Sequence, residues 1–262
     1  MPIMRIYKFN KILKEIIFMV KKTTIMFVIA LLSFPAASFA YETIEVKNGG
    51  NIEGTVEFLG ATIPLDRIIA SSSDEKYCGK ERPAEKYVIS AERRIKNVVV
   101  FIEEIKAGKA IPEETVTVTD SSCTFVPHVS VGFKGNKFVV KNEDPILHTI
   151  HVYTYISGKT MYNIGLPEKD SVVTKPLTKT GLMELNCDCH PWMLGYVYIF
   201  DHPYAAVTNE KGEFVMKDIP PGTYTLEAWH EALGKVRLTE VRVESGETSK
   251  IRLGYTWEIN LY

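Results

Sequence analysis

Four side chains that can bind a metal ion lie close together in the segment NCDCHPWMLG, residues 186–195. They are Cys187, Cys189, His190 and Met193. Thiolate and imidazole bind copper strongly in both of its oxidation states, and a weak axial thioether tunes the reduction potential. The upstream segment VVKNEDPILHTIHVY, residues 139–153, adds His148 and His151. A trigonal plane of two imidazoles and one thiolate needs one ligand from such a distant segment.

The strand period separates these candidates. If residues 148–153 form a strand, His148 shares a face with the apolar Ile150 and Val152, while His151 points to the opposite face. In the later strand, Cys187 follows Met183 and Leu185 on one face, so its thiol enters the site from the core. Pro191 argues against a strand that continues far enough to place Cys189 on the same face.

Spacing weighs against several other sites. A c-type haem needs Cys-x-x-Cys-His, and this segment is one residue short. The two cysteines are also too close for a dinuclear copper centre. A zinc site with Cys187, Cys189, His190 and a fourth ligand stays open, although Met193 and the β context favour copper. A redox pair of Cys187 and Cys189 stays open too, although a disulfide across one intervening residue is strained.

The elements that must position these residues are predicted to be strands. Short apolar or alternating runs, such as KNVVVFIEE, HTIHVYTY and GTYTLEAW, recur at about ten-residue spacing with turn residues between them. This pattern predicts an all-β chain of sandwiches or barrels.

The first 40 residues have the features of an export signal. Lys21 and Lys22 precede the short apolar run IMFVIALLSF, and ASFA ends at Ala40. Met19 is an alternative start, and an uncleaved anchor is the alternative to cleavage. The run is short for a membrane span, so we expect no stable span after cleavage. The rest of the chain has 25 basic and 31 acidic residues, which does not favour nucleic-acid binding.

Two motifs near the C-terminus resemble those of the carboxypeptidase regulatory-like domain, a small transthyretin-like β-sandwich. They are T-x-x-x-G-x-F at Thr208–Phe214 and P-x-G-x-Y-x-L at Pro220–Leu226. The earlier strands of the pattern lie about 100 residues upstream. We therefore expect a discontinuous sandwich, 46–105 plus 204–262, with a second domain inserted at 110–203. Tandem domains are the alternative.

The inserted segment resembles the plastocyanin-like cupredoxin family, in which an Asn, a short loop and a His precede Cys-x-x-His-x-x-Met. The resemblance implies a Greek-key β-barrel or sandwich that holds one type 1 copper ion per chain. It also implies that His148, Cys187 and His190 form the ligand plane, that Met193 is axial and that Asn142 orients the ligand loops. Cys189 departs from the family, where a small apolar residue is usual. Cys189 and His151 are therefore candidate extra metal ligands.

With Cys187 assigned to the metal, the remaining cysteines allow the pairs 78–123, 78–189 and 123–189. We favour Cys78–Cys123 as a link between the two domains. The isolated His128, His202 and His230 are predicted to be structural.

The resemblance implies an exported protein, periplasmic or extracellular, that transfers single electrons and is not an enzyme. We expect the exposed edge of His190 to be the electron port and a redox protein such as a c-type cytochrome to be the partner, with no small-molecule substrate. Two alternatives are a non-redox module that binds polysaccharide or a surface protein, and a periplasmic copper-binding or copper-delivery protein.

Overall fold

The computed structural model describes Phe18 and residues 40–256. The chain divides into two compact units, Met1–Ala40 and Tyr41–Tyr262, and the description below concerns the second unit. Apart from Phe18 and Ala40, the expected export signal and the alternative start at Met19 lie outside the described residues. Within the described part of the chain, no helix is both long enough and apolar enough to cross a membrane.

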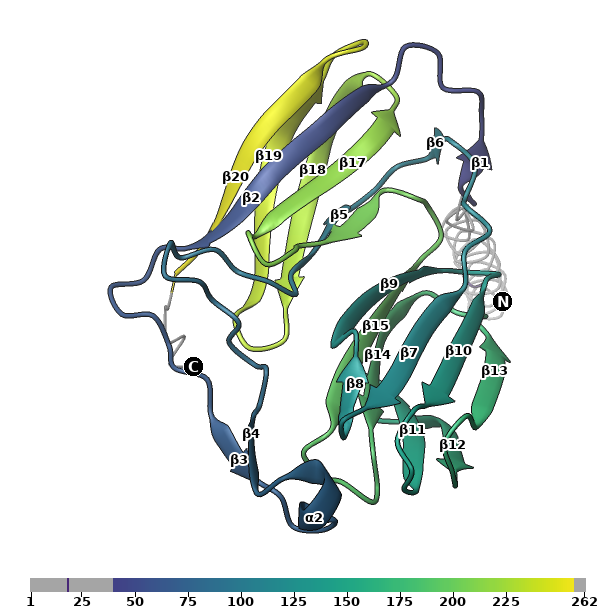
Figure 1. The fold of residues 1–262 in the computed structure, drawn as a ribbon. Coiled ribbons are helices and arrows are strands. Elements are labelled where there is room, and N and C mark those ends of the chain that lie inside the picture. Colours follow the sequence, from purple (N-terminus) through teal and green to yellow (C-terminus); the bar gives the residue numbers. More distant parts are fainter. Residues whose placement is uncertain (1–17, 19–39, 257–262) are drawn as a thin grey trace, which may run out of the picture. The chain divides into compact units, whose positions relative to one another are not determined.

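Two facing sheets come from residues 116–200 (Figure 1). One has the strand order β13-β10-β7-β8 and the other β12-β11-β14-β15-β9. Their bounds are β7 Val116–Ser121, β8 Thr124–Val126, β9 Val129–Phe133, β10 Lys137–Asn142, β11 His148–Thr154, β12 Thr160–Leu166, β13 Val172–Pro176, β14 Gly181–Asn186 and β15 Leu194–Phe200. Their inward side chains form one core, to which Phe138, Val152 and Leu185 belong.

Two further sheets, β16-β5-β18-β19 and β17-β2-β20, enclose a second core that includes Ile52, Val100 and Leu226. Their bounds are β2 Gly50–Phe58, β5 Val99–Ile102, β16 Ala205–Val207, β17 Glu213–Ile219, β18 Gly222–His230, β19 Gly234–Val243 and β20 Thr248–Tyr255. These strands therefore lie before and after the segment 116–200 in the chain. There is also a short parallel pair, β1 Glu42–Thr43 with β6 Ala107–Gly108.

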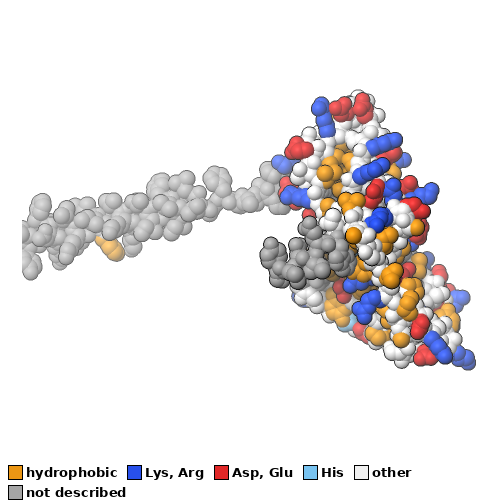
Figure 2. Space-filling view, turned by 90° about the vertical axis from the view of Figure 1, so that its left-hand side faces the viewer, with side chains coloured by type: hydrophobic (Ala, Val, Ile, Leu, Met, Phe, Trp, Pro, Cys, Tyr) orange, Lys and Arg blue, Asp and Glu red, His pale blue; other side chains and the backbone are white. Residues whose placement is uncertain are grey.

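The expectation of an all-β chain is confirmed, with sandwiches and no closed barrel among the described residues. Strand alternation also follows the prediction. In β11, His148, Ile150 and Val152 are buried whereas His151 is partly exposed. Figure 2 shows basic and acidic side chains interspersed over one face of the molecule.

Residues 68–83, here called the strap, leave the second pair of sheets and pack against the first. The strap contains β3 Ile68–Ala70, the four-residue helix α2 Glu75–Cys78 and β4 Glu81–Pro83. Cys78 belongs to the core of the 116–200 sheets, and Ile69 packs against that core. The sequence pattern predicts this segment to be part of the discontinuous sandwich 46–105 plus 204–262, and it has no feature that indicates the contact.

Candidate metal centre

Three donor atoms converge from two neighbouring strands. His148 begins β11, and Cys187 directly follows β14, which pairs with β11 through His151 and Asn186. His190 comes from the loop after Cys187. The Cys187 Sγ lies 3.8 Å from His148 Nδ1 and 3.6 Å from His190 Nδ1, and the two Nδ1 atoms are 2.9 Å apart. The three side chains are buried.

The triangle of donor atoms fits a single metal ion. A triangle with these sides is acute, so it encloses a point that is about 2.0 Å from all three atoms. Metal–imidazole bonds are about 2.0–2.1 Å and metal–thiolate bonds about 2.3 Å. Two imidazoles and one thiolate in a plane is the donor set of a blue-copper site. The residues therefore fit a copper ion held by His148, Cys187 and His190.

The loop after Cys187 is folded by two successive backbone hydrogen bonds. The His190 N–H donates to the Cys187 carbonyl oxygen at 3.2 Å, and the Met193 N–H donates to the His190 carbonyl oxygen at 2.9 Å. Met193 is buried in the same core cluster as Cys187. The structure therefore brings Met193 to the end of the ligand loop, close in the chain to the other ligands, with its thioether away from solvent.

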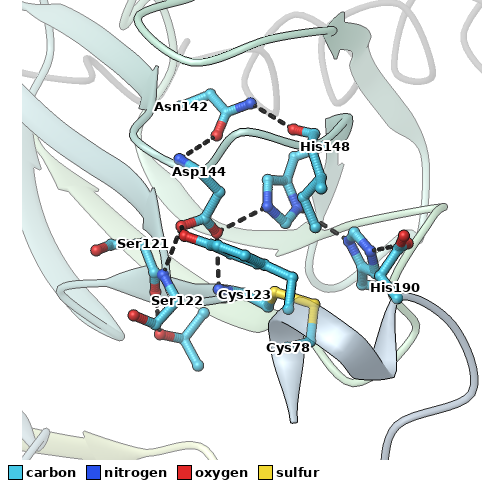
Figure 3. Close-up of polar contacts among 12 residues, drawn as sticks. Cys78, Ser121, Ser122, Cys123, Asn142, Asp144, His148 and His190 are labelled. Atoms are coloured by element: carbon cyan, nitrogen blue, oxygen red, sulfur yellow. Dashed lines mark hydrogen bonds and ion pairs between the residues drawn. A yellow bond between two sulfur atoms is a disulfide. The ribbon is translucent and has the colours of Figure 1, made fainter.

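A carboxylate holds the outer nitrogen of His148. The His148 Nε2–H donates to Asp144 Oδ2 at 2.9 Å, and both side chains are buried (Figure 3). Burial alone would raise the pKa of the Asp144 carboxyl. Hydrogen bonds from the Cys123 N–H, the Ser122 N–H and Tyr77 Oη nevertheless hold that pKa below its usual value. Burial lowers the pKa of His148, and the bond to Asp144 opposes this only in part. The bond to Asp144 occupies Nε2 of His148, so Nδ1 is the nitrogen that points toward the other donor atoms and can bind a metal.

Asn142 fixes the loop that carries Asp144 and leads to His148. Its side-chain amide donates to the carbonyl oxygens of Ile146 and Leu166 at 2.8 and 3.0 Å, and its Oδ1 accepts from the Asp144 N–H at 2.8 Å. Asn142 is fully buried. It therefore orients the loop before His148 through backbone groups, as the sequence analysis expected.

The expectation that the edge of His190 is exposed is wrong. His190 is 0% exposed, and its Nε2 lies 3.0 Å from Asp74 Oδ2 in the strap. The ring centre of Trp192 lies 5.0 Å from that of His190, and Trp192 is buried as well. The cause is the strap, whose contact with His190 spans 116 residues of sequence.

The thiol of Cys187 has its own donors. The Thr149 N–H lies 3.3 Å from Cys187 Sγ, and Thr149 Oγ1 lies 3.7 Å from it. Thr149 Oγ1 also accepts from the Asp188 N–H at 2.7 Å. Both groups of Thr149 can donate a hydrogen bond to the sulfur. Cys187 also lines an open pocket of about 580 Å³ together with Tyr153, Tyr155, Glu184, Asp188 and other residues.

The two candidate extra ligands lie differently. His151 is on the opposite face of β11, where its ring contacts Asp188, Thr160 and Tyr153 rather than the donor triangle. Cys189 is a free, partly exposed cysteine beside Cys187. Burial, followed by the neighbouring Cys187, raises the pKa of Cys189. Cys189 lies outside the triangle of His148, Cys187 and His190, and its role as an extra ligand stays a prediction.

Cys78 and Cys123 form a disulfide, the pairing that the sequence analysis favoured. It joins α2 of the strap to the β7–β8 turn (Figure 3). Asp74, Asp144 and Thr149 were not identified as site residues from the sequence. Asp144 and Thr149 lie within two residues of Asn142 or His148, so local position could have indicated them. Asp74 is far in the chain from every predicted ligand, so nothing in the sequence indicated it.

Comparisons with known proteins give partial matches. Residues 199–251 match the family model described as polysaccharide lyase family 4, domain II, which covers too little of the chain to define its family. The carboxypeptidase regulatory-like assignment stays a prediction. No curated protein shows significant similarity to the chain.

The solved structures that resemble the chain include cupredoxins. An amicyanin from Paracoccus versutus is 16% identical, with 38% of this chain and 97% of that chain covered and a TM-score of 0.29. A copper-containing nitrite reductase from Thermus scotoductus is 23% identical, with 38% and 25% covered and a TM-score of 0.29. A purple cupredoxin from Nitrosopumilus maritimus is 17% identical, with 32% and 99% covered and a TM-score of 0.28. With TM-scores this low, the assignment of the metal depends on the donor atoms of this chain.

Proposed function

We propose that this chain is an exported type 1 copper protein that carries single electrons by outer-sphere transfer and is not an enzyme. The observation that carries the proposal is the buried triangle of one thiolate and two imidazole donors around a point about 2.0 Å from each. Copper bound there supplies a one-electron couple. Met193 is the proposed axial ligand, and one ion per chain is the proposed stoichiometry.

The residues around the triangle support electron transfer more than bond chemistry. His148 and His190 are 0% exposed and Cys187 is 2% exposed, so a substrate has little access to the donor atoms. Paired strands and the Asn142 hydrogen bonds hold the ligands in place. A rigid donor set favours rapid electron transfer because few atoms must move when the charge changes.

Cys187 is the proposed side of electron exit. The strap covers His190, whereas Cys187 lines the open pocket beside Tyr155. The proposed partner is a redox protein such as a c-type cytochrome, in the periplasm or outside the cell. A small-molecule substrate and nucleic acid have no part in the proposal.

The test is a one-electron titration of the copper-loaded chain. Metal analysis should give one copper per chain, and the reduced protein should pass one electron per chain to an oxidised c-type cytochrome. Cys187→Ser, which removes the thiolate, should abolish the transfer, whereas Cys189→Ser should not. Tight binding of zinc with no reversible uptake of an electron after copper loading would overturn the proposal.

The match of residues 199–251 to polysaccharide lyase family 4, domain II favours one second candidate, a non-redox module that binds polysaccharide through the second pair of sheets. A pulldown with insoluble polysaccharides tests it. Retention that is the same with metal-free and copper-loaded protein would support this candidate. Absence of retention on every polysaccharide would exclude it.

A further inference from the structure

The outer nitrogen of His190 is held by a residue from a distant part of the chain. His190 Nε2 lies 3.0 Å from Asp74 Oδ2 across 116 residues of sequence. The imidazole is 0% exposed, whereas the Asp74 side chain is 47% exposed, so the carboxylate closes the site on its solvent side. An ionised carboxylate only accepts hydrogen bonds, so the Nε2–H of His190 is the donor.

The strap that carries Asp74 is fastened at several points around the metal centre. The Cys78–Cys123 disulfide ties it to the β7–β8 turn. Tyr77 Oη donates to Asp144 Oδ1 at 2.9 Å, and Ser73 Oγ donates to the Cys189 carbonyl oxygen at 3.1 Å. The Arg82 guanidinium donates to the Ser122 carbonyl oxygen and lies 5.4 Å from the centre of the Trp192 ring.

These contacts give Asp74 a fixed place relative to the ligands. Ser73 precedes it and bonds to the ligand loop, and Tyr77 follows it and bonds to the carboxylate that holds His148. The Asp74 backbone has φ 48°, a left-handed conformation that Asp tolerates better than most residues. The strap therefore holds the Asp74 carboxylate at one position beside His190.

The chemistry of this contact acts on the metal through the imidazole. A hydrogen bond from Nε2–H to a carboxylate fixes the tautomer, so that the Nδ1 lone pair faces Cys187. The same bond makes the imidazole a stronger donor, which stabilises the more positively charged state of a bound ion. Asp144 does this for His148 from within the sandwich, and Asp74 does it for His190 from the strap.

We propose that Asp74 is a positioning residue that orients His190 and stabilises the oxidised over the reduced copper site. The effect on the reduction potential, here called the electronic part, rests on the proposed function. The orientation of His190, here called the orienting part, does not require copper and can be tested on the metal-free chain. The strap thereby links the reduction potential to a segment outside the sheets that supply the ligands.

Glu75 provides a matched control. It lies next to Asp74 in the strap and is exposed, and the contact it makes in α2 is through its backbone carbonyl. Glu75→Gln therefore removes the same charge from the same segment without changing the bond to His190. The reduction potentials of copper-loaded wild-type, Asp74→Asn and Glu75→Gln proteins are compared.

Asp74→Asn should shift the equilibrium at least tenfold toward the reduced site, an increase of about 59 mV for a one-electron couple. Glu75→Gln should change the reduction potential by less than a third of the shift in Asp74→Asn. Equal shifts of the reduction potential in the two variants would mean that Asp74 acts only through its charge and would contradict the proposal. An unchanged reduction potential in Asp74→Asn, with an intact visible spectrum, would overturn the electronic part.

Nitrogen NMR of the metal-free protein at about pH 8 tests the orienting part without copper. In the wild-type protein Nε2 of His190 should carry a proton, and Asp74→Ala should lower the occupancy of that proton, while Nε2 of His148 keeps its proton through Asp144. An unchanged His190 tautomer in Asp74→Ala would overturn the proposal even if copper binds. If the wild-type chain forms no thiolate–copper band but the tautomer shifts, the proposed function fails and the orienting role stands.

Discussion

Cys189 is the liganding residue of the segment 186–195 that the donor triangle leaves aside. Its thiol lies beside Cys187, and burial raises its pKa, so it stays protonated near neutral pH. Among the described residues, the close group of donor atoms that contains a free thiol joins His148, Cys187 and His190 and does not include Cys189. The difference between the two cysteines comes from the end of β14 at Asn186, after which the chain turns.

Cys189→Ser is expected to leave the metal centre unchanged. One copper ion per chain should bind, with a visible spectrum like that of the wild-type protein, because serine preserves the size of a side chain that donates no ligand. Metal analysis and absorption measure this. A second copper ion bound by the wild-type chain and lost in Cys189→Ser would instead make Cys189 a ligand.

His230 gives the stability of the protein a pH dependence. Burial lowers the pKa of His230 from 6.5 to about 4, and its Nδ1 accepts hydrogen bonds from the Ala232 and Leu233 N–H groups. Well above pH 6.5 the imidazole is neutral in both the folded and the unfolded state. Below it, the unfolded chain binds the proton first, so the free energy of unfolding falls until the pH reaches about 4.

The measurement is urea unfolding at several pH values between 6.5 and 4.5. His230→Asn keeps an acceptor but cannot take up a proton in this range, so it should lose less stability than the wild type across the interval. The full contribution is on the order of 3 kcal/mol. If the free energy of unfolding fell equally with pH in the two proteins, His230 would not be the cause of the pH dependence.

At the scale of elements, the strap is held in place by one covalent bond. The Cys78–Cys123 disulfide closes a loop with a sequence separation of 45 and joins two buried positions. Loss of the constraint on the unfolded chain should cost about 4 kcal/mol. Replacing both residues by alanine should therefore lower the free energy of unfolding by about this amount in urea titrations.

Wild-type protein kept reduced by an excess of dithiol throughout the urea titration provides a check on that double variant, because both lack the covalent link and no cysteine is modified. The two should unfold at similar urea concentrations. A double variant within 1 kcal/mol of the oxidised wild type would mean that the noncovalent contacts of the strap suffice.

The strands could be predicted from the sequence because their side chains alternate with a period of two. The strap has no such period, so its place beside the metal centre could not be predicted. Alternation along β11 separated His148 from His151 because successive strand side chains point to opposite faces. The motif around Cys187 gave the spacing of the ligand loop. The contact of Asp74 with His190 could not be predicted, because its residues are 116 positions apart and a polar strap has no periodic pattern. The same contact overturned the expected electron port.

At the scale of the whole molecule, aromatic contacts and a buried hydrogen bond join the two pairs of sheets. The Trp229 ring of β18 lies 5.2 Å from the Tyr196 ring of β15. His128 Nε2 pairs with Glu231 Oε1 close by, and these side chains are only 5% and 3% exposed. Removing one partner of a buried pair leaves the other uncompensated.

Glu231→Ala should consequently destabilise the protein by about 3 kcal/mol or more in urea unfolding. Glu210, whose side chain is 72% exposed and pairs with Lys96, provides the control. Glu210→Ala should cost less than about 1 kcal/mol. Similar costs for the two substitutions would contradict a special role for the buried pair.

The visible absorption spectrum of the copper-loaded protein tests the central claim most directly. A thiolate in the plane of a type 1 site gives an intense charge-transfer band, so the wild-type chain and Cys189→Ser should show the band and Cys187→Ser should lack it. Absence of an intense band from the copper-loaded wild type, or a band that survives in Cys187→Ser, would contradict the assignment of His148, Cys187 and His190 as a copper site.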